Sequence, residues 1–110
     1  MGMKLTIQST EEEEVECAVI KRPKENDIRE ELSREEFDFA ILQKTPLTYI
    51  QCVRLTDTDR FILQYQDGST DFHYENEKPV SRSRAVSALI WYLREDDSWL
   101  TEFVWERIVI

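Results

Sequence analysis

The dipeptide Asp67-Gly68 stands between two runs of alternating apolar and polar residues, RFILQYQ before it and STDFHY after it. Such alternation is typical of strands with one buried face, and Asp-Gly favours a two-residue type I′ turn. The pattern predicts a β-hairpin in which Gln66 faces Ser69. The next pairs on one face are then apolar and aromatic: Tyr65 with Thr70, Leu63 with Phe72 and Phe61 with Tyr74. Helices or a second sheet must cover such a face.

Further strand signals lie on both sides of this hairpin. Lys4–Gln8 alternates weakly, while Val15–Ile20 and Leu47–Leu55 are rich in strand-forming residues. The acids Glu11–Glu14 predict a solvated loop, because adjacent like charges repel in any compact arrangement. The last run, Phe103–Ile110, is apolar on both faces, which predicts a buried central strand.

A first helix is predicted from a capping signal. Ser33 can accept from the amide of Glu36, and the Glu36 side chain can reach back to Ser33, with Leu32 and Phe37 at the flanking staple positions. This helix would end near Gln43.

A longer helix that begins near Asn26 or Asp27 is the alternative, with Ile28 and Leu32 on its inner face. Three apolar residues beyond Ser33 also recur at helical spacing, namely Phe37, Ala40 and Ile41.

The second helix follows Ser81 or Ser83, either of which can cap its N-terminus. Its apolar stripe at i, i+3, i+4 and i+7 consists of Val86, Leu89, Ile90 and Leu93. We therefore expect one domain over residues 1–110 with an α+β fold. Its antiparallel sheet contains a meander with the Asp-Gly hairpin and a C-terminal strand, and two helices pack on it.

Catalytic and metal-binding patterns are sparse. His73 is the only histidine, and the predicted hairpin places Asp71 on its face. No serine, cysteine or second histidine joins them, which favours a structural or solvent-facing histidine over an enzyme that uses His73 with Asp71. Asp57–Asp59 lacks the spaced ligands and glycine of a calcium loop, and we read it as part of a turn. We expect no catalytic residue, no metal and no cofactor.

The two cysteines, Cys17 and Cys52, lie outside any CxxC pair. We expect reduced, partly buried thiols in a cytoplasmic protein. A disulfide is the alternative for an exported chain, but the first ten residues lack the apolar segment of an export signal.

Charge is the strongest global signal: 23 acids stand against 14 Lys and Arg, a net charge of −9. Such a surface is repelled by nucleic acid and anionic membranes and attracted to basic proteins. Plain solubility is the alternative. Asp96 and Asp97 follow a helix, where acids oppose the negative end of its dipole. Their position indicates a contact role, with a solvated helix end as the alternative.

The three tryptophans differ in their setting. Trp105 alternates with its neighbours in a predicted strand, so we expect it in the core. Trp91 lies between two stripe positions and is either core edge or exposed contact. Trp99 lies outside both elements. It is either a plug in the helix-to-strand connection or an anchor for a partner.

The C-terminal half contains a predicted strand with YxDG, a helix followed by DDxW, and a last strand with FxWE. The residues of this pattern are Tyr65, Asp67, Gly68, Ser81, Ala85, Ala88, Tyr92, Leu93, Asp96, Asp97, Trp99, Phe103, Trp105 and Glu106. The pattern resembles the first-numbered immunity family of bacterial polymorphic toxin systems.

The resemblance implies a non-enzymatic α+β protein that is encoded beside a toxin, binds it in the cytoplasm and blocks it. Toxins beside this family are often nucleic-acid deaminases or nucleases. Because such enzymes present basic channels, an acidic inhibitor can occupy the channel as a phosphate mimic. Complementary charge also speeds association.

Our leading hypothesis is therefore an immunity protein whose partner is a basic toxin domain. The candidate contacts are Asp96, Asp97 and Trp99, with Asp71 and Glu13 in the Glu11–Glu14 run as further candidates. The alternative is an acidic adaptor or chaperone-like module that uses the same surface without a toxin. The nature of the partner distinguishes the two.

Overall fold

One antiparallel sheet forms the body of the protein. The computed structural model describes residues 2–109. The strands are β1 (Lys4–Glu11), β2 (Glu14–Lys21), β3 (Phe37–Thr45), β4 (Thr48–Arg54), β5 (Arg60–Asp67), β6 (His73–Asn76), β7 (Val80–Ser81) and β8 (Trp105–Arg107). Their order across the sheet is β2-β1-β3-β4-β5-β6-β8, and the short β7 also pairs with β5. The predicted α+β fold with an antiparallel sheet is confirmed.

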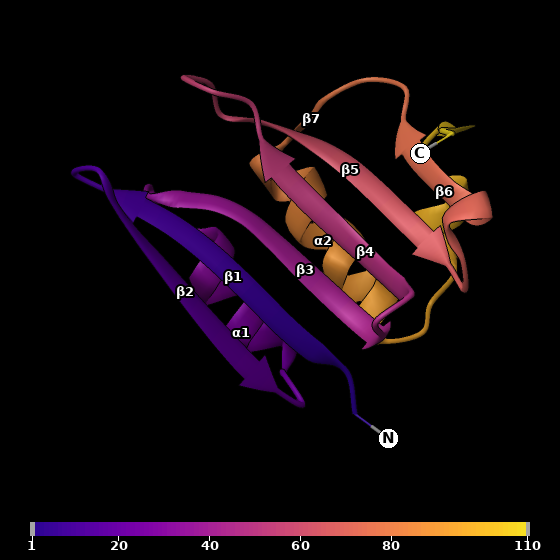
Figure 1. Cartoon of the computed structure of the whole chain (residues 1–110), viewed down its shortest axis with the longest axis horizontal. Helices are drawn as coiled ribbons and strands as arrows, with labels where there is room; N and C mark the ends of the chain where they lie inside the picture. Colours follow the sequence, from indigo (N-terminus) through magenta and orange to yellow (C-terminus); the bar gives the residue numbers. More distant parts are fainter. Residues whose placement is uncertain (1, 110) are drawn as a thin grey trace.

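The helices lie on one side of this sheet, as Figure 1 shows for α1 and α2. They are α1 (Glu25–Leu32), α2 (Arg82–Leu93) and the short α3 (Ser98–Thr101), and a 3-10 turn, η1 (Thr70–Phe72), precedes β6. None of the helices between residues 2 and 109 has the length and apolar character needed to cross a membrane.

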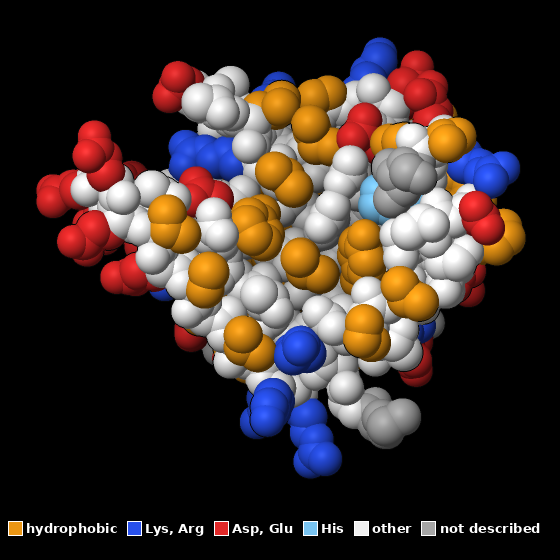
Figure 2. Space-filling model, in the orientation of Figure 1, with side chains coloured by type: hydrophobic (Ala, Val, Ile, Leu, Met, Phe, Trp, Pro, Cys, Tyr) orange, Lys and Arg blue, Asp and Glu red, His pale blue; other side chains and the backbone are white. Residues whose placement is uncertain are grey.

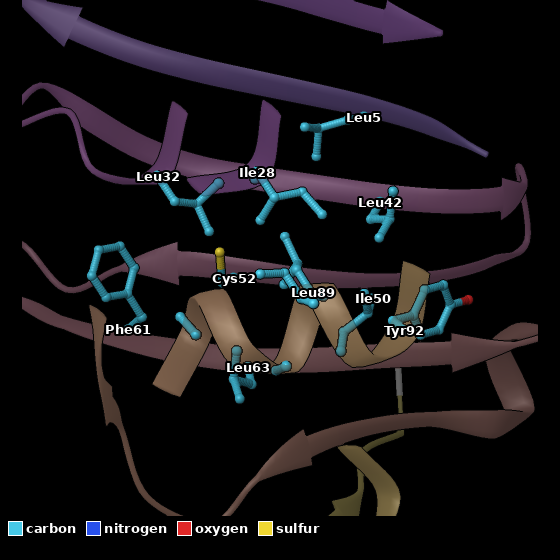
Figure 3. Close-up of a cluster of buried hydrophobic side chains, with 14 of the residues drawn as sticks. Leu5, Ile28, Leu32, Leu42, Ile50, Cys52, Phe61, Leu63, Leu89 and Tyr92 are labelled. Atoms are coloured by element: carbon cyan, nitrogen blue, oxygen red, sulfur yellow. The ribbon is translucent and has the colours of Figure 1, made fainter. Parts of the chain in front are cut away.

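The core fills the layer between the sheet and the two longer helices (Figure 3). Alternate strand residues point into it, because successive side chains of a strand face opposite sides. The fully buried apolar side chains include Leu5, Leu42, Ile50, Cys52, Phe61 and Leu63 from strands and Ile28, Leu32 and Leu89 from helices. Each buried large side chain contributes roughly 1.5–3 kcal/mol.

The helix predicted from Ser33 to Gln43 is wrong. Helix α1 ends at Leu32, and Ser33 is its C-cap, with a hydroxyl that donates to the carbonyl of Glu30 at 2.8 Å. The alternative that began near Asn26 or Asp27 places this helix correctly.

Residues beyond Ser33 form strand β3, and a β-bulge explains their misleading spacing. Gln8 pairs with Phe39 and Ser9 with Phe37, so Asp38 has no partner of its own. The bulge shifts the alternation, and the buried residues become Phe37, Ala40 and Leu42. The three-residue step from Phe37 to Ala40 coincides with helical spacing, whereas Ile41 lies on the other face of the strand.

The Asp-Gly hairpin has a different register from the predicted one. Gln66 pairs with His73 and Tyr65 with Tyr74. Gly68 has a positive φ of 83°, and Asp67 does not, whereas a type I′ turn requires positive φ at both central residues. The hydroxyl of Ser69 accepts from the amide of Asp71 and starts η1, which lengthens the connection.

A two-residue turn with positive φ at both central residues is found instead within Glu11–Glu14. Glu12 and Glu13 have φ of 50° and 70° and connect β1 to β2. Glu11 and Glu14 are directly paired strand residues. The predicted loop is thus confirmed at its centre, although two of its four acids belong to strands.

The second predicted helix is confirmed, with Ser81 as its N-cap: the hydroxyl accepts from the amide of Arg84 at 3.3 Å. The buried face of this helix is rotated by about one residue relative to the predicted stripe, because Ala85 and Ala88 allow the helix to pack closely on the sheet. Val86 and Leu93 are half-buried, whereas the buried residues are Ala85, Ala88, Leu89, Ile90 and Tyr92.

The prediction of a buried central strand at the C-terminus is wrong. Only Trp105–Arg107 forms a strand, and it pairs with β6 alone at the edge of the sheet. Val104 and Val109 are 62% and 90% exposed. Ile110 lies outside the described residues.

Candidate functional site

The side of the sheet opposite the helices has no covering element between residues 2 and 109, and we call it the open face (Figure 2). Its centre is formed by half-buried side chains of β3, β4 and β5. These are Phe39, Ile41, Tyr49, Gln51, Val53, Ile62 and Gln64. None of them is charged, although 34% of the chain is Asp, Glu, Lys or Arg. An uncharged patch inside a charged rim is typical of a binding surface.

Charged residues lie around this centre, as the red and blue atoms of Figure 2 show. The β1–β2 turn contributes Glu11–Glu14, and the β4–β5 turn contributes Asp57 and Asp59. At the β6–β8 edge, Glu75 and Glu106 are paired neighbours. The rim is therefore predominantly acidic at these three places.

A row of amides crosses the open face. Gln51 donates to Gln64, and Gln64 donates to Glu75 at 2.8 Å. The side chains thus link β4, β5 and β6. Such a row fixes the orientation of donors and acceptors before any partner arrives, which lowers the entropy cost of binding.

His73 belongs to this face but is almost fully buried, with 5% exposure. Its Nδ1 lies 3.2 Å from Oε1 of Gln66, and its ring packs edge-on against Tyr49. Gln66 in turn donates to the carbonyl of Leu47 at 3.2 Å. His73 therefore has the structural environment that the sequence favoured.

Between residues 2 and 109, the hydrogen bond of the His73 side chain is to Gln66 and not to Asp71. Asp71 is exposed in η1, where its amide donates to Ser69 and its carbonyl accepts from Arg107 at 2.7 Å. Among residues 2–109, no group of three or more His, Cys, Asp or Glu side chains is arranged to hold a metal.

The cysteines differ in environment. Cys52 is fully buried in the core, and burial raises the pKa of its thiol to about 12. Cys17 is exposed on β2, where its thiol contacts Gln8. Both are free thiols, but the prediction of partial burial fits neither of them.

The tryptophans meet in an aromatic cluster at the end of the helix layer. Trp99 packs edge-on against Tyr65 with ring centroids 4.8 Å apart, and it also contacts Tyr92. Trp105 contacts Tyr65 from another side at 4.7 Å. Trp105 is half-buried against the core, as expected, and Trp99 joins α3 to the sheet as a plug.

Trp91 lies at the edge of this cluster. It is half-buried, and its ring lies 6.4 Å from that of Phe103. Of the two alternatives for Trp91, the core edge describes its contacts within the chain.

The acidic segment after α2 consists of residues with unequal roles. Oδ1 of Asp96 accepts from both the amide and the hydroxyl of Ser98, at 3.0 and 2.7 Å, and these bonds lower the pKa of its carboxyl. Arg94 forms two 2.6 Å hydrogen bonds with Glu25 of α1. Asp97 is exposed, and no side-chain bond to α3 is formed by it.

The predicted contact residues do not lie on one surface. Glu13 is in the turn that begins the β2 edge, whereas Asp71 is beside β6 near the opposite edge. Asp96, Asp97 and Trp99 lie in the α2–α3 region on the helix side. The sequence reasoning missed Phe39 and Ile41 because it placed them in a helix. Glutamines at alternating positions, Gln51, Gln64 and Gln66, were the signal for an uncharged sheet face.

Comparison with protein-family models, curated proteins and solved structures finds no match. The residues that resemble the immunity family can therefore be judged only by their places in the fold. Most of them have structural roles: Ser81 caps α2, Ala85 and Ala88 pack in the core, and the aromatic residues form the cluster above. The exposed ones are Asp67, Gly68, Asp96, Asp97 and Glu106.

Proposed function

We propose that this chain is a non-enzymatic, cytoplasmic immunity protein that binds a basic toxin domain and blocks it. The observation that supports the proposal best is the open face, with its uncharged centre, its ordered amide row and the acidic turns and edge beside it. The resemblance of the C-terminal half to an immunity family supports the same assignment.

The open face fits a basic enzyme in two ways. Its centre offers apolar contact area at Phe39, Ile41 and Ile62, which can exclude water from the interface. Glu12 and Glu13 of the β1–β2 turn and Asp57 of the β4–β5 turn then lie where they meet positive charge, while Asp59 is paired with Arg82 of the same chain. Acidic rims attract a basic partner and raise association rates, to as much as ~10⁸–10⁹ M⁻¹s⁻¹ at low salt. A rapid response is useful when a toxin arrives from a neighbouring cell.

The proposal is tested by a rescue assay. The C-terminal domain of the protein encoded immediately upstream is expressed with and without this chain, and surviving cells are counted. Rescue from an otherwise lethal domain is expected. A harmless neighbour, or equal killing in both cultures, would contradict immunity.

A pair of matched variants then locates the interface. Ile41→Arg places a positive charge in the centre of the open face, and Val104→Arg places the same charge at an exposed position on the β6–β8 side. We expect the first to weaken toxin binding by at least about thirtyfold, as for a central interface residue, and the second to leave it unchanged. Equal effects would remove the open face from the interface.

An adaptor or chaperone-like module is the second candidate. The uncharged centre of the open face favours it, since Ile41, Val53 and Ile62 suit an apolar partner without basic charge. Capture of a regulator or a secreted substrate through the face that Ile41→Arg disrupts, together with failure of rescue, would favour this function.

A further inference from the structure

Strand β2 is the free outer edge of the sheet. It is hydrogen-bonded to β1 alone, and nearly all of its residues are exposed. Val15 and Val19 are 59% and 56% exposed. The strand is eight residues long, pairs regularly with β1 and contains no proline. Long, regular edges of this kind pair readily with another strand unless they are protected.

The ladder with β1 determines which backbone groups of β2 are free. The amide of Arg22 donates to the carbonyl of Met3 at 2.9 Å. Inward and outward pairs alternate along an antiparallel ladder. Ala18 and Ile20 therefore bond to β1, whereas the N–H and C=O groups of Cys17 and Val19 point away from the sheet.

The charges of β2 divide by position along the strand. Its acids are Glu14 and Glu16, with Glu12 and Glu13 in the turn just before it, and Lys21 and Arg22 lie at its end. Among residues 2–109, no ion pair is recorded for any of these side chains. The edge thus has one negative and one positive end, both without an internal partner.

We propose that β2 pairs with β2 of a second copy of this chain in antiparallel orientation. The two-fold axis then brings the acidic end of each strand beside the basic end of the other. This charge complementarity favours a second copy, because a strand of another sequence matches both ends only by coincidence. The two sheets join edge to edge, with their open faces on the same side.

Backbone alternation restricts the register. Residues with outward groups must face each other, and the registers of this kind that overlap most of the eight residues are centred on Cys17 or on Ala18. The first pairs Val15 with Val19 of the partner copy, on the open-face side. Both place Glu13 or Glu14 near Lys21 and Arg22 of the other copy.

Sedimentation measurements with charge-exchanged variants test the pairing. One variant has Lys21→Glu and Arg22→Glu, and the other has Glu13→Lys and Glu14→Lys. Wild-type protein is expected at twice the monomer mass, and each variant alone should dimerise at least about tenfold more weakly, because like charges then face each other. A mixture of the two should restore a dimer with one copy of each.

A second pair of variants tests the edge without reversing charge. Val19→Pro removes an outward-pointing amide and leaves the bonds to β1 in place, so it should abolish the dimer with little change in melting temperature. Thr6→Lys on the neighbouring strand is the control for a change on the same face, and it should dimerise normally. If Val19→Pro fails to fold, Val19→Lys replaces it, with the same expected loss.

Three results would overturn the proposal. A wild-type chain that is monomeric at all accessible concentrations excludes self-pairing. A wild-type dimer that survives in both charge variants and in Val19→Pro uses another surface. A monomer whose partner binding is lost in Val19→Pro uses the edge for a strand of that partner instead. None of these results bears on the rescue assay, which tests the proposed function separately.

Discussion

The indole Nε1 of Trp105 donates a hydrogen bond to the backbone carbonyl of Trp99 at 3.1 Å, and the two rings lie edge to face with centroids 6.1 Å apart. One tryptophan of the last strand thus fixes the other on α3. Both rings also contact Tyr65 of β5. The contact joins the end of the helix layer to the sheet.

Loss of this contact should lower stability. We expect Trp99→Ala to cost about 3 kcal/mol in the free energy of unfolding, because it removes the centre of the cluster. Trp105→Phe should cost about 1 kcal/mol through the lost hydrogen bond. Denaturant unfolding measures both, with Trp91→Phe as the control. A Trp99→Ala variant of normal stability would show that the ring serves a partner rather than the fold.

Two adjacent aspartates should separate stability from binding. Asp96→Ala removes two bonds to Ser98 and should lower the melting temperature, whereas Asp97→Ala should leave it unchanged. Asp97→Lys then asks whether the exposed carboxylate meets a toxin. An unchanged dissociation constant for Asp97→Lys would exclude Asp97 from the interface.

The thiols should react at very different rates. The native protein should react with a colorimetric disulfide reagent at Cys17 alone, because Cys52 is fully buried with a thiol pKa raised to about 12. Both thiols should react in denaturant. Replacement of Cys17 by serine should abolish the native reaction. Persistent reaction in that variant would mean that the core opens at Cys52.

Stability should fall in acid through Glu25 and Asp96. The hydrogen bonds from Arg94 lower the pKa of Glu25, and those from Ser98 lower the pKa of Asp96. A carboxyl with a lowered folded pKa stabilises the fold above its ordinary pKa and loses that contribution as the pH falls through the folded value. Melting temperatures should therefore drop below about pH 4. Arg94→Gln should reduce the fall in melting temperature at low pH. A variant with the same pH profile as the wild type would contradict the role given to Glu25.

The acidic turn should be easy to stabilise. Glu12 and Glu13 both have left-handed backbone conformations, which glycine and asparagine adopt at lower cost. The variant Glu12→Asn with Glu13→Gly should gain about 1 kcal/mol in unfolding free energy. If dimerisation or partner binding weakens in the same variant, Glu12 and Glu13 contribute to that interface and not to the stability of the fold.

Much of the fold was predictable where local signals agree. The strands around Val15, Leu47 and Phe61 and the helix capped by Ser81 were all predicted from alternation or capping. The failures have local physical causes. A bulge at Asp38 made a strand resemble a helix, and Ser69 lengthened a turn that Asp-Gly alone would have made tight. The spacing of apolar residues predicts neither the bulge at Asp38 nor the N-cap at Ser69.

The candidate site was less predictable than the fold. Its centre depends on which of two sheet faces the helices cover, and this is decided by contacts distant in sequence. Phe39 and Ile41 became surface residues only once β3 was a strand. Asp96 was predicted as a contact residue from its charge, but its carboxylate accepts hydrogen bonds from Ser98 and so has a structural role.

Along β3, β4 and β5, successive residues face either the core or the open face. Leu42 and Ile50 hold the interior, while Ile41 and Gln51 beside them touch only the outer side. Because the two sets of side chains lie on opposite faces of the strands, the outer residues can be exchanged while Leu42 and Ile50 still fill the interior. The same framework can therefore present different binding surfaces.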